Sequence, residues 1–166
     1  MNRKFVLFGV VLTITMISQI ILAIVFYNDL SLDWLCNIGW ATLWISAVFG
    51  LLPILTFRKY GGVDPKKSYM RTQRLVDKGI YRIVRHPQYV SGILISIGLC
   101  LITQHWASML LGAANIFQLA VSAISEEGES RVKFGTAYEE YMQRVPRFNF
   151  ITGFFWLILP KKKSNH

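Results

Sequence analysis

The chain has 166 residues, of which 53% are apolar and 16% charged, and its mean hydropathy is +0.40. An ordinary soluble domain has about a quarter of its residues charged, so this composition indicates a membrane protein. A nucleotide-binding α/β domain would take up nearly the whole length, which argues against such an enzyme carried on a separate anchor. The net charge of +9 would suggest nucleic acid as the partner of a soluble protein, but in a membrane protein it records topology.

Apolar segments predict four membrane-spanning helices, because about 20 apolar residues are needed to cross a bilayer. Residues 5–27 and 34–57 are long enough, and the first is too long for the core of a signal peptide. Residues 89–104 and 106–125 follow one another with almost no break and predict a helical hairpin. The aromatic-rich run 148–159 is too short to cross, which favours a C-terminal amphipathic helix at the membrane interface.

The positions of the basic residues predict the orientation of these spans. All 18 Lys and Arg lie before the first span, between the second and third, or after the fourth, and none lies in turns 28–33 or 104–105. Since basic residues remain on the cytosolic side, we expect a multi-pass protein with both termini in the cytosol and no nucleic-acid partner. The expected fold is an all-α integral membrane protein that forms a single domain over residues 1–166. The short turns favour a prokaryotic inner membrane over the endoplasmic reticulum.

Cysteine and histidine give little sign of special chemistry. Cys36 and Cys100 both fall near the non-cytosolic ends of their helices, so a disulfide is conceivable, but packing is the commoner role of such residues. The sequence holds neither CxxC nor HExxH, and its three histidines are scattered. We therefore expect no metal site.

The first long cytosolic segment, residues 58–88, contains several Gly and Pro residues that break it into short pieces. Pro87 suits the first turn of the third membrane helix, where its missing N–H costs nothing. The amino end of that helix, beside Arg85 and His86, is a predicted anion site. A basic turn that only meets lipid headgroups is the alternative interpretation of the same residues.

The second cytosolic segment, residues 126–148, begins with two adjacent carboxylates, Glu126 and Glu127, where positive charge is expected. Ordinary helix pairing at i,i+4 accounts for part of the charge, through Glu127 with Arg131 and Glu140 with Arg144. An apolar stripe at helical spacing predicts one buried face of an amphipathic helix, formed by Phe134, Tyr138, Tyr141 and Val145. Because the hairpin returns to the cytosolic side, we expect the Glu pair and the His86 turn to be neighbours.

These motifs follow a recognisable order along the chain. G-x-Y-x-x-x-R-H-P-x-Y occupies residues 79–89, a hairpin follows, then E-E at 126–127 and F-G-x-x-Y-x-x-Y-x-x-x-V-P at 134–146. This order resembles the isoprenylcysteine carboxyl methyltransferase and phospholipid N-methyltransferase superfamily over residues 73–148, nearly half of the chain. The resemblance implies a membrane enzyme that uses S-adenosylmethionine, held in a cytosolic pocket under the C-terminal region. A lipid acceptor would reach it from the bilayer.

The resemblance also implies the residues of the site. Those expected to bind the cofactor are Gln73, Arg74, Leu75, Val76, Tyr81, Arg85, His86, Pro87, Gln88, Tyr89, Glu126 and Glu127. Those expected to be catalytic are Glu127 and Arg144, and those expected near the acceptor are Ser122, Arg131 and Arg147. The chemistry agrees, because the sulfonium and ammonium of the cofactor favour carboxylates and aromatic faces. Its carboxylate favours His86, Arg85 or helix-terminal N–H groups.

The acceptor is where the sequence departs from the resemblance. An amine must lose its proton before it attacks, and Glu127 could act as the base, whereas a carboxylate or thiolate acceptor needs a cation to hold it. The resemblance implies an arginine one helical turn before Glu126, and this position holds Ser122. We therefore expect a phospholipid-type amine, with an isoprenylcysteine carboxylate or a small apolar thiol or acid as the alternative. A non-enzymatic four-helix protein that binds anionic lipid is the alternative of another class.

Overall fold

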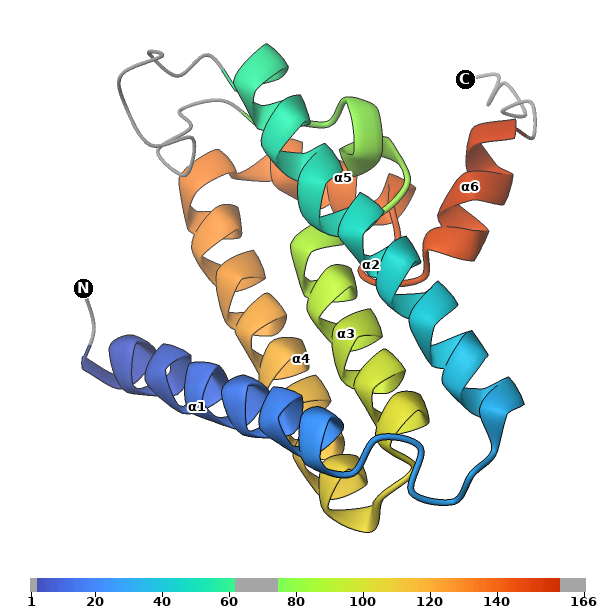
Figure 1. Cartoon of the computed structure of the whole chain (residues 1–166). Coiled ribbons are helices and arrows are strands. Elements are labelled where there is room, and N and C mark those ends of the chain that lie inside the picture. Colours follow the sequence, from blue (N-terminus) through green and yellow to red (C-terminus); the bar gives the residue numbers. More distant parts are fainter. Residues whose placement is uncertain (1–2, 62–74, 159–166) are drawn as a thin grey trace. The chain divides into compact units, whose positions relative to one another are not determined.

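The computed structural model describes residues 3–61 and 75–158, and within these ranges the chain is helical with no strand. The elements shown in Figure 1 are α1 (Arg3–Val25), α2 (Asp33–Tyr60), the 3-10 turn η2 (Gly79–Arg82), α3 (Pro87–Thr103), α4 (Trp106–Phe134), α5 (Thr136–Arg144) and α6 (Phe150–Ile158). The chain divides into two units. The first comprises Met1–Val48 with Tyr89–Ser125, and the second comprises Phe49–Gln88 with Glu126–His166.

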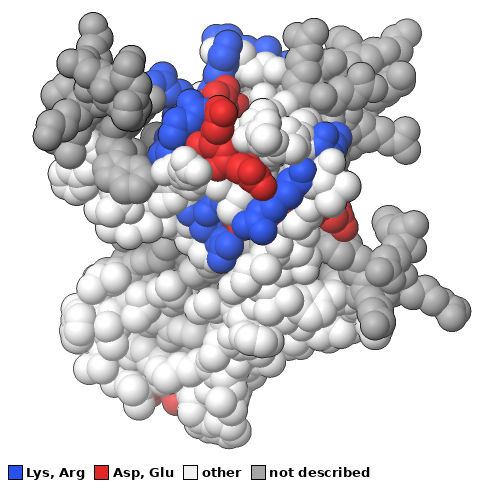
Figure 2. Space-filling model, turned by 180° about the vertical axis from the view of Figure 1, so that it is seen from behind, with Lys and Arg blue, Asp and Glu red and all other residues white. Residues whose placement is uncertain are grey.

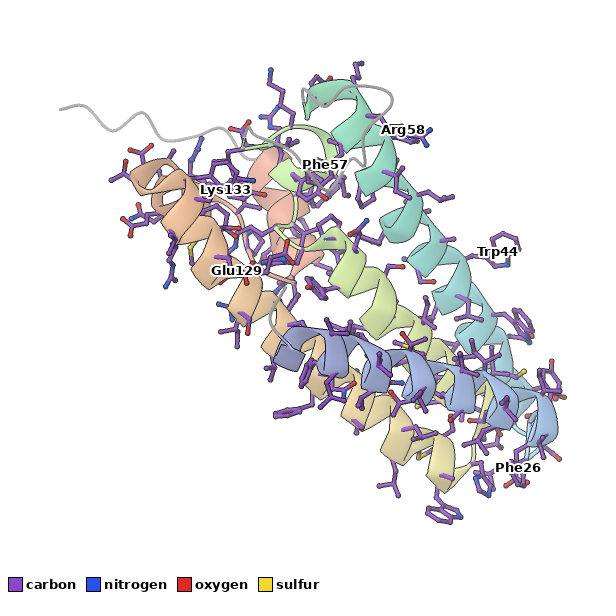
Figure 3. All side chains as sticks on the ribbon, turned by 90° about the vertical axis from the view of Figure 1, so that its left-hand side faces the viewer. Phe26, Trp44, Phe57, Arg58, Glu129 and Lys133 are labelled. Carbon is purple, nitrogen blue, oxygen red and sulfur yellow. The ribbon has the colours of Figure 1, made fainter. Side chains whose placement is uncertain are left out.

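Three of the helices, α1, α2 and α4, are long and apolar enough to cross a membrane, whereas α3 is an apolar helix of 17 residues. These helices expose many large apolar side chains, as expected of a surface that faces lipid. For example, Trp44 of α2 is 76% exposed and projects away from the ribbon (Figure 3). Helix α3 begins at Pro87, as its sequence predicted. These findings support an integral membrane protein, and the fourth span remains a prediction.

Helix α4 differs from the sequence prediction at its carboxyl end. The expected span ended at residue 125, but the helix continues to Phe134, so Glu126 and Glu127 lie inside it. The apolar window ends before the helix does, because i→i−4 backbone bonding continues through polar residues that are compatible with a helix. The Glu pair is consequently held on a regular helix, with neighbouring side chains pointing in different directions.

The first unit contains a network of polar side chains between apolar helices. Gln19 of α1 is fully buried, and its Nε2 donates to the carbonyl of Ser96 on α3 at 3.0 Å and to that of Ser108 on α4 at 3.3 Å. Asn115 Nδ2 donates to Gln19 Oε1 at 3.0 Å. Gly112 makes room, since a Cβ there would lie 3.0 Å from Gln19 Nε2. An unsatisfied polar group in hydrocarbon costs several kcal/mol, so this network fixes the register of α1 on the hairpin.

The connections of the first unit are also hydrogen-bonded. Gln104, in the turn between α3 and α4, has a φ of 55° and donates from Nε2 to Asn28 Oδ1 at 2.8 Å and to the carbonyl of Leu32 at 3.0 Å. Cys36 and Cys100 are both free, in agreement with the packing role expected of them. This end of the unit is thus held by side-chain amides without a covalent link.

The second unit has its core where α5 meets the chain around η2. Tyr138, Tyr141 and Val145 are buried together, with partly buried hydrophobic side chains packed against them, which are Leu75, Phe134 and Met142. The predicted stripe is therefore buried at Tyr138, Tyr141 and Val145 and partly buried at Phe134, but the single helix expected over it is wrong. The chain breaks at Gly135, with φ 58°, and a new helix begins at Thr136. This backbone conformation favours glycine and lets α5 fold back after α4.

Helix α6 packs against other parts of the second unit through Phe150 and Gly153. Phe150 packs against Phe49, with ring centroids 4.8 Å apart. Gly153 faces the carbonyl of Ile83 so closely that any Cβ at this position would overlap it. The aromatic residues Phe154 and Phe155 remain 52% and 57% exposed. Such a helix, with one side packed and exposed aromatics on the other, suits the interfacial position expected for this segment.

Candidate functional site

The second unit contains a buried carboxylate, that of Glu127, which is 2% exposed. Arg147 binds this carboxylate through a fork of two hydrogen bonds, in which Nε donates to Oε1 at 3.0 Å and Nη2 donates to Oε2 at 2.6 Å. His86 Nε2 lies 3.1 Å from Oε1 and donates to it when this nitrogen carries the proton. Arg85 Nη1 also lies 3.1 Å from Oε1. Two positive charges and an imidazole thus face one negative charge.

Backbone contacts hold the chain after α5 against the start of α3. The amide of Arg85 donates to the carbonyl of Pro146 at 3.0 Å, and the amide of His86 donates to the carbonyl of Arg147 at 3.3 Å. The ring of Phe148 lies beside that of His86, with centroids 6.2 Å apart. These contacts place the Arg147 side chain next to Glu127 although 20 residues separate them in the sequence.

The guanidinium of Arg85 is incompletely satisfied. Its side chain is 9% exposed, and its Nε and Nη1 are buried without a hydrogen-bond partner. The contact of Nη1 with Glu127 is therefore an electrostatic one, in which the N–H bonds do not point at the carboxylate. Buried donors without an acceptor are rare in proteins, and each one calls for an explanation.

Burial and charge shift the acidity of the site. Burial lowers the pKa of His86 below its ordinary value, and the nearby Glu126 and Glu127 carboxylates oppose this shift. The hydrogen bonds with Glu127 raise the pKa of Arg147, which keeps it charged. Above the lowered pKa, His86 is neutral and is a donor to Glu127 through Nε2. The cluster therefore carries a net charge of one positive unit, from Arg85 and Arg147 against Glu127.

Tyr141 connects α5 to the turn that leads into the site. Its hydroxyl donates to the carbonyl of Tyr81 at 2.7 Å, and burial raises the pKa of this phenol. The ring of Tyr81 meets that of Phe57 edge-on, with centroids 4.9 Å apart. Gly79, with φ 58°, lies against Thr56, where a Cβ would come within 2.8 Å of the hydroxyl. The turn is thus fixed from both α2 and α5.

The structure brings together some of the predicted site residues. Around Glu127 it gathers Arg85, His86 and Arg147, with Pro87 buried next in the chain. Tyr81 and Val76 are buried in the same unit, and Leu75 is partly buried. The expected neighbourhood of the His86 turn and the Glu pair is therefore present for Glu127.

Other predicted residues are exposed, belong to the first unit or lie outside the described ranges. Glu126 and Gln88 are exposed, as are Arg131 and Arg144. Arg131 Nε donates to Met142 Sδ at 3.4 Å, and Arg144 Nε donates to the carbonyl of Glu140 at 3.3 Å. Tyr89 and Ser122 belong to the first unit. Gln73 and Arg74 lie outside the residues that the structure describes.

Sequence reasoning missed two features of this site. The predicted local pair of Glu127 with Arg131 is replaced by the fork from Arg147, and no sequence spacing indicated that contact. The role of Tyr141 in holding Tyr81 was also missed, although the apolar stripe had singled Tyr141 out as buried. Among the described residues there is no cluster of three or more His, Cys, Asp or Glu that could hold a metal ion.

The surface of the second unit carries charge of both signs. Exposed acidic and basic residues follow one another along the end of α4 and in α5, among them Glu129 and Lys133 (Figure 3). Figure 2 shows acidic side chains bordered by basic ones on part of the displayed face, while much of that face is uncharged. Charged side chains are stable in water and costly in hydrocarbon, so this surface suits a position outside the hydrocarbon core.

Comparison with known proteins identifies the family. The family described as phospholipid methyltransferase matches residues 34–137, which include the His86 turn, the hairpin and the Glu pair. The chain belongs to this family. Together with the relatives below, this confirms the resemblance seen in the motifs and makes the protein a membrane methyltransferase.

Two curated relatives carry names of a more specific activity. Protein-S-isoprenylcysteine O-methyltransferase B of Arabidopsis thaliana is 27% identical over 132 residues, which cover 78% of this chain and 67% of the relative. Protein-S-isoprenylcysteine O-methyltransferase of Schizosaccharomyces pombe is 34% identical over 73 residues, covering 43% of this chain and 31% of the relative. No solved structure matches the chain.

Proposed function

We propose that this protein transfers the methyl group of S-adenosylmethionine to the carboxylate of a lipid-like acceptor, of the isoprenylcysteine type. The observation that carries the proposal is the state of Glu127, whose two oxygens are both occupied by Arg147. A carboxylate so bound is a poor general base, and an amine acceptor would need one. The names of the two relatives, both O-methyltransferases, support the same choice.

The residues of the second unit fit a cofactor that carries both signs of charge. Buried N–H groups without acceptors on Arg85 suit a carboxylate, and the exposed Glu126 suits an ammonium or sulfonium. When bound, S-adenosylmethionine would supply a methyl group whose bond to the positively charged sulfur breaks as an acceptor oxygen bonds to the methyl carbon, so that S-adenosylhomocysteine leaves. The protein then needs only to bind the ligands, orient them and keep water out.

The contributions of individual residues follow from their contacts. Tyr141 and Phe57 hold the Tyr81 turn, and the backbone of Pro146 and Arg147 holds the start of α3. Glu127 fixes the direction of Arg147 and His86. In this proposal Glu127 is a positioning residue, and the catalytic role expected of it from the sequence is not retained. Arg144, exposed and bonded to its own helix, is likewise left out of the catalytic group.

A phospholipid amine remains the second candidate, favoured by Ser122 at the position where the resemblance implies an arginine. The two acceptors are distinguished by incubating the purified protein with methyl-labelled cofactor and either N-acetyl-S-farnesylcysteine or phosphatidylethanolamine. We expect label on the farnesylcysteine, as a methyl ester that releases methanol in alkali. Alkali-stable label on phosphatidylethanolamine would instead establish the amine acceptor.

Binding of the cofactor is tested separately by calorimetric titration with S-adenosylhomocysteine. We expect the protein in detergent to bind it, and His86→Ala to weaken binding while helicity is retained. A folded protein that does not bind would overturn the cofactor part of the proposal.

A further inference from the structure

The exposed side of α6 is apolar. Ile151, Phe154 and Phe155 are 59%, 52% and 57% exposed, and their i, i+3 and i+4 spacing places them on one face of this helix. Helix α6 holds no charged residue, and the sequence continues after Ile158 into three lysines at positions 161–163. An apolar helix face next to basic residues is typical of binding at the boundary between lipid headgroups and acyl chains. We infer that α6 binds the surface of an anionic bilayer and that this binding regulates the affinity of the site for its ligand.

The other side of α6 is packed on the chain that leads into the site. Phe150 lies against Phe49, and a Cβ on Gly153 would overlap the carbonyl of Ile83. Ile83 ends the η2 turn and is followed closely in the sequence by Arg85. The helix approaches this backbone so closely only because residue 153 has no side chain. The position of α6 and the position of the chain before α3 therefore depend on one another.

The segment that enters α6 is bound to the same part of the chain. The amide of His86 donates to the carbonyl of Arg147 at 3.3 Å, and the ring of Phe148 lies beside the His86 ring. The guanidinium of Arg147 in turn binds both oxygens of Glu127. Because α6 begins at Phe150, a displacement of this helix would also move Arg147 and Phe148. Such a displacement would loosen the buried ion pair with Glu127.

Lipid regulates the site only if it favours the packed arrangement of α6 over a displaced one. With Phe150 and Gly153 packed against the unit, the three large side chains on the other face are left to water unless lipid covers them. Burial of apolar surface is favourable, so a bilayer stabilises the packed arrangement. The apparent affinity for a ligand falls with the fraction of protein that is competent to bind it. Because this ligand is the proposed cofactor, the regulation rests on the proposed function.

The first measurement locates α6 in the full chain, reconstituted in nanodiscs of phosphatidylcholine alone or of equal parts phosphatidylcholine and phosphatidylglycerol. A nitroxide label is placed on Ile151→Cys, in a background with Cys36→Ser and Cys100→Ser. Its accessibility is compared for oxygen, which concentrates among acyl chains, and for a nickel chelate, which stays in water. We expect the label to lie among acyl chains in the anionic discs. A label in water in both discs, or one shielded from both reagents by protein, would overturn the binding of α6 to lipid.

The second measurement is calorimetric titration of the same nanodiscs with S-adenosylhomocysteine. One variant combines Phe154→Gln with Phe155→Gln, which removes the apolar face and leaves the packed face intact. A second combines Lys161→Gln, Lys162→Gln and Lys163→Gln, and its charge-conserving counterpart carries arginine at the three positions. Val132→Gln is the matched control for loss of an exposed apolar side chain, since Val132 is 90% exposed on α4. Circular dichroism checks that helicity is retained.

We expect wild type to bind S-adenosylhomocysteine more tightly in anionic discs, by up to about 100-fold, since each lysine near an anionic surface contributes about fivefold to association. The triple Gln variant should lose this dependence and the triple Arg variant should keep it. The Phe154 and Phe155 variant should bind weakly in both discs, and Val132→Gln should behave as wild type. Equal affinity of wild type in the two discs, or a dependence that survives the loss of all three lysines, would overturn the regulation. A label among acyl chains with no ligand binding in either disc would instead overturn the proposed function.

Discussion

Glu127 is the residue on which the charge balance of the second unit depends. It is 2% exposed and is the shared partner of Arg85, His86 and Arg147. A buried ion pair gives little net stability relative to apolar residues, because both ions lose water, but removing one partner leaves the others uncompensated. The arrangement therefore makes the fold of this unit sensitive to any loss of the carboxylate.

Glu127→Gln should lower the free energy of unfolding by about 3 kcal/mol, because breaking a buried pair costs about 3 to 5 kcal/mol and the amide retains some hydrogen bonds. The measurement is denaturation in detergent followed by circular dichroism. Glu129→Gln is the control, since Glu129 is exposed on the same helix and surface changes stay within about 0.5 kcal/mol. Equal effects of the two substitutions would show that Glu127 is not an essential counter-ion.

The pKa of His86 predicts how stability depends on pH. Burial lowers this pKa below the ordinary value of 6.5, so the unfolded chain binds a proton more readily than the folded chain. Stability should be fully present above pH 6.5 and fall as pH decreases toward the lowered pKa, by at most about 1.4 kcal/mol per pH unit. Thermal midpoints between pH 8 and pH 5 check this, with His86→Gln expected to give a flatter profile. A profile identical to wild type would mean that another group titrates.

At the scale of elements, the contact between α5 and the η2 turn depends on one hydroxyl. Tyr141→Phe keeps the buried ring but removes the donor to the carbonyl of Tyr81. We expect a loss of about 1 kcal/mol in unfolding free energy, the net worth of a typical hydrogen bond. Tyr60→Phe is the matched control, because Tyr60 is 39% exposed at the end of α2. Weaker S-adenosylhomocysteine binding by Tyr141→Phe alone would show that the turn contributes to the site.

Two glycines of the same segment should respond to alanine in opposite directions. Gly135 has φ 58°, and a Cβ added there would meet no heavy atom within 4 Å, so its substitution is strained by the backbone alone. Such a conformation costs about 1 to 3 kcal/mol for other residues. Gly128, inside α4 with equally open space, should instead gain up to about 1 kcal/mol from the helix propensity of alanine. Equal signs for the two variants, measured by denaturation, would contradict the break between α4 and α5.

The elements show what the sequence could and could not predict. Apolar length located α1 to α4, because hydrophobic segments of that length form helices in a membrane, and a shorter aromatic-rich run located α6. The stripe predicted the burial of Tyr138 and Tyr141, but helical spacing carries no sign of the break at Gly135. After that break the chain returns toward α4, and Arg147 binds Glu127. Local i,i+4 spacing had instead indicated Arg131 as the partner of Glu127. A contact across 20 residues depends on this tertiary path, so the fork was not predictable from periodicity.

At the scale of the whole molecule, the number of spans depends on α3. Its 17 residues are about 26 Å long at 1.5 Å per residue, slightly less than a hydrocarbon core of about 30 Å. Modest mismatch is tolerated through local thinning of the bilayer, and α3 is joined to α4 by a short turn. If α4 crosses, an antiparallel α3 beside it crosses too. The basic residues before α3 and those after α4 also favour a crossing α3, because both groups would then lie in the cytosol.

The spans are counted by placing single cysteines in a background in which Cys36 and Cys100 are changed to Ser. We expect Arg82→Cys and Lys133→Cys to react with an impermeant maleimide from the cytosolic side, and Asp29→Cys from the opposite side, since all three positions are exposed. Four spans require the first two positions to share a side, because α3 and α4 lie between them. If α3 did not cross, Arg82→Cys and Lys133→Cys would be labelled from opposite sides. That result would leave three spans and place the residues around His86 on the opposite face of the membrane from those after α4. The contacts of Glu127 with His86 and Arg147 require these residues to lie on the same face, so we expect four spans.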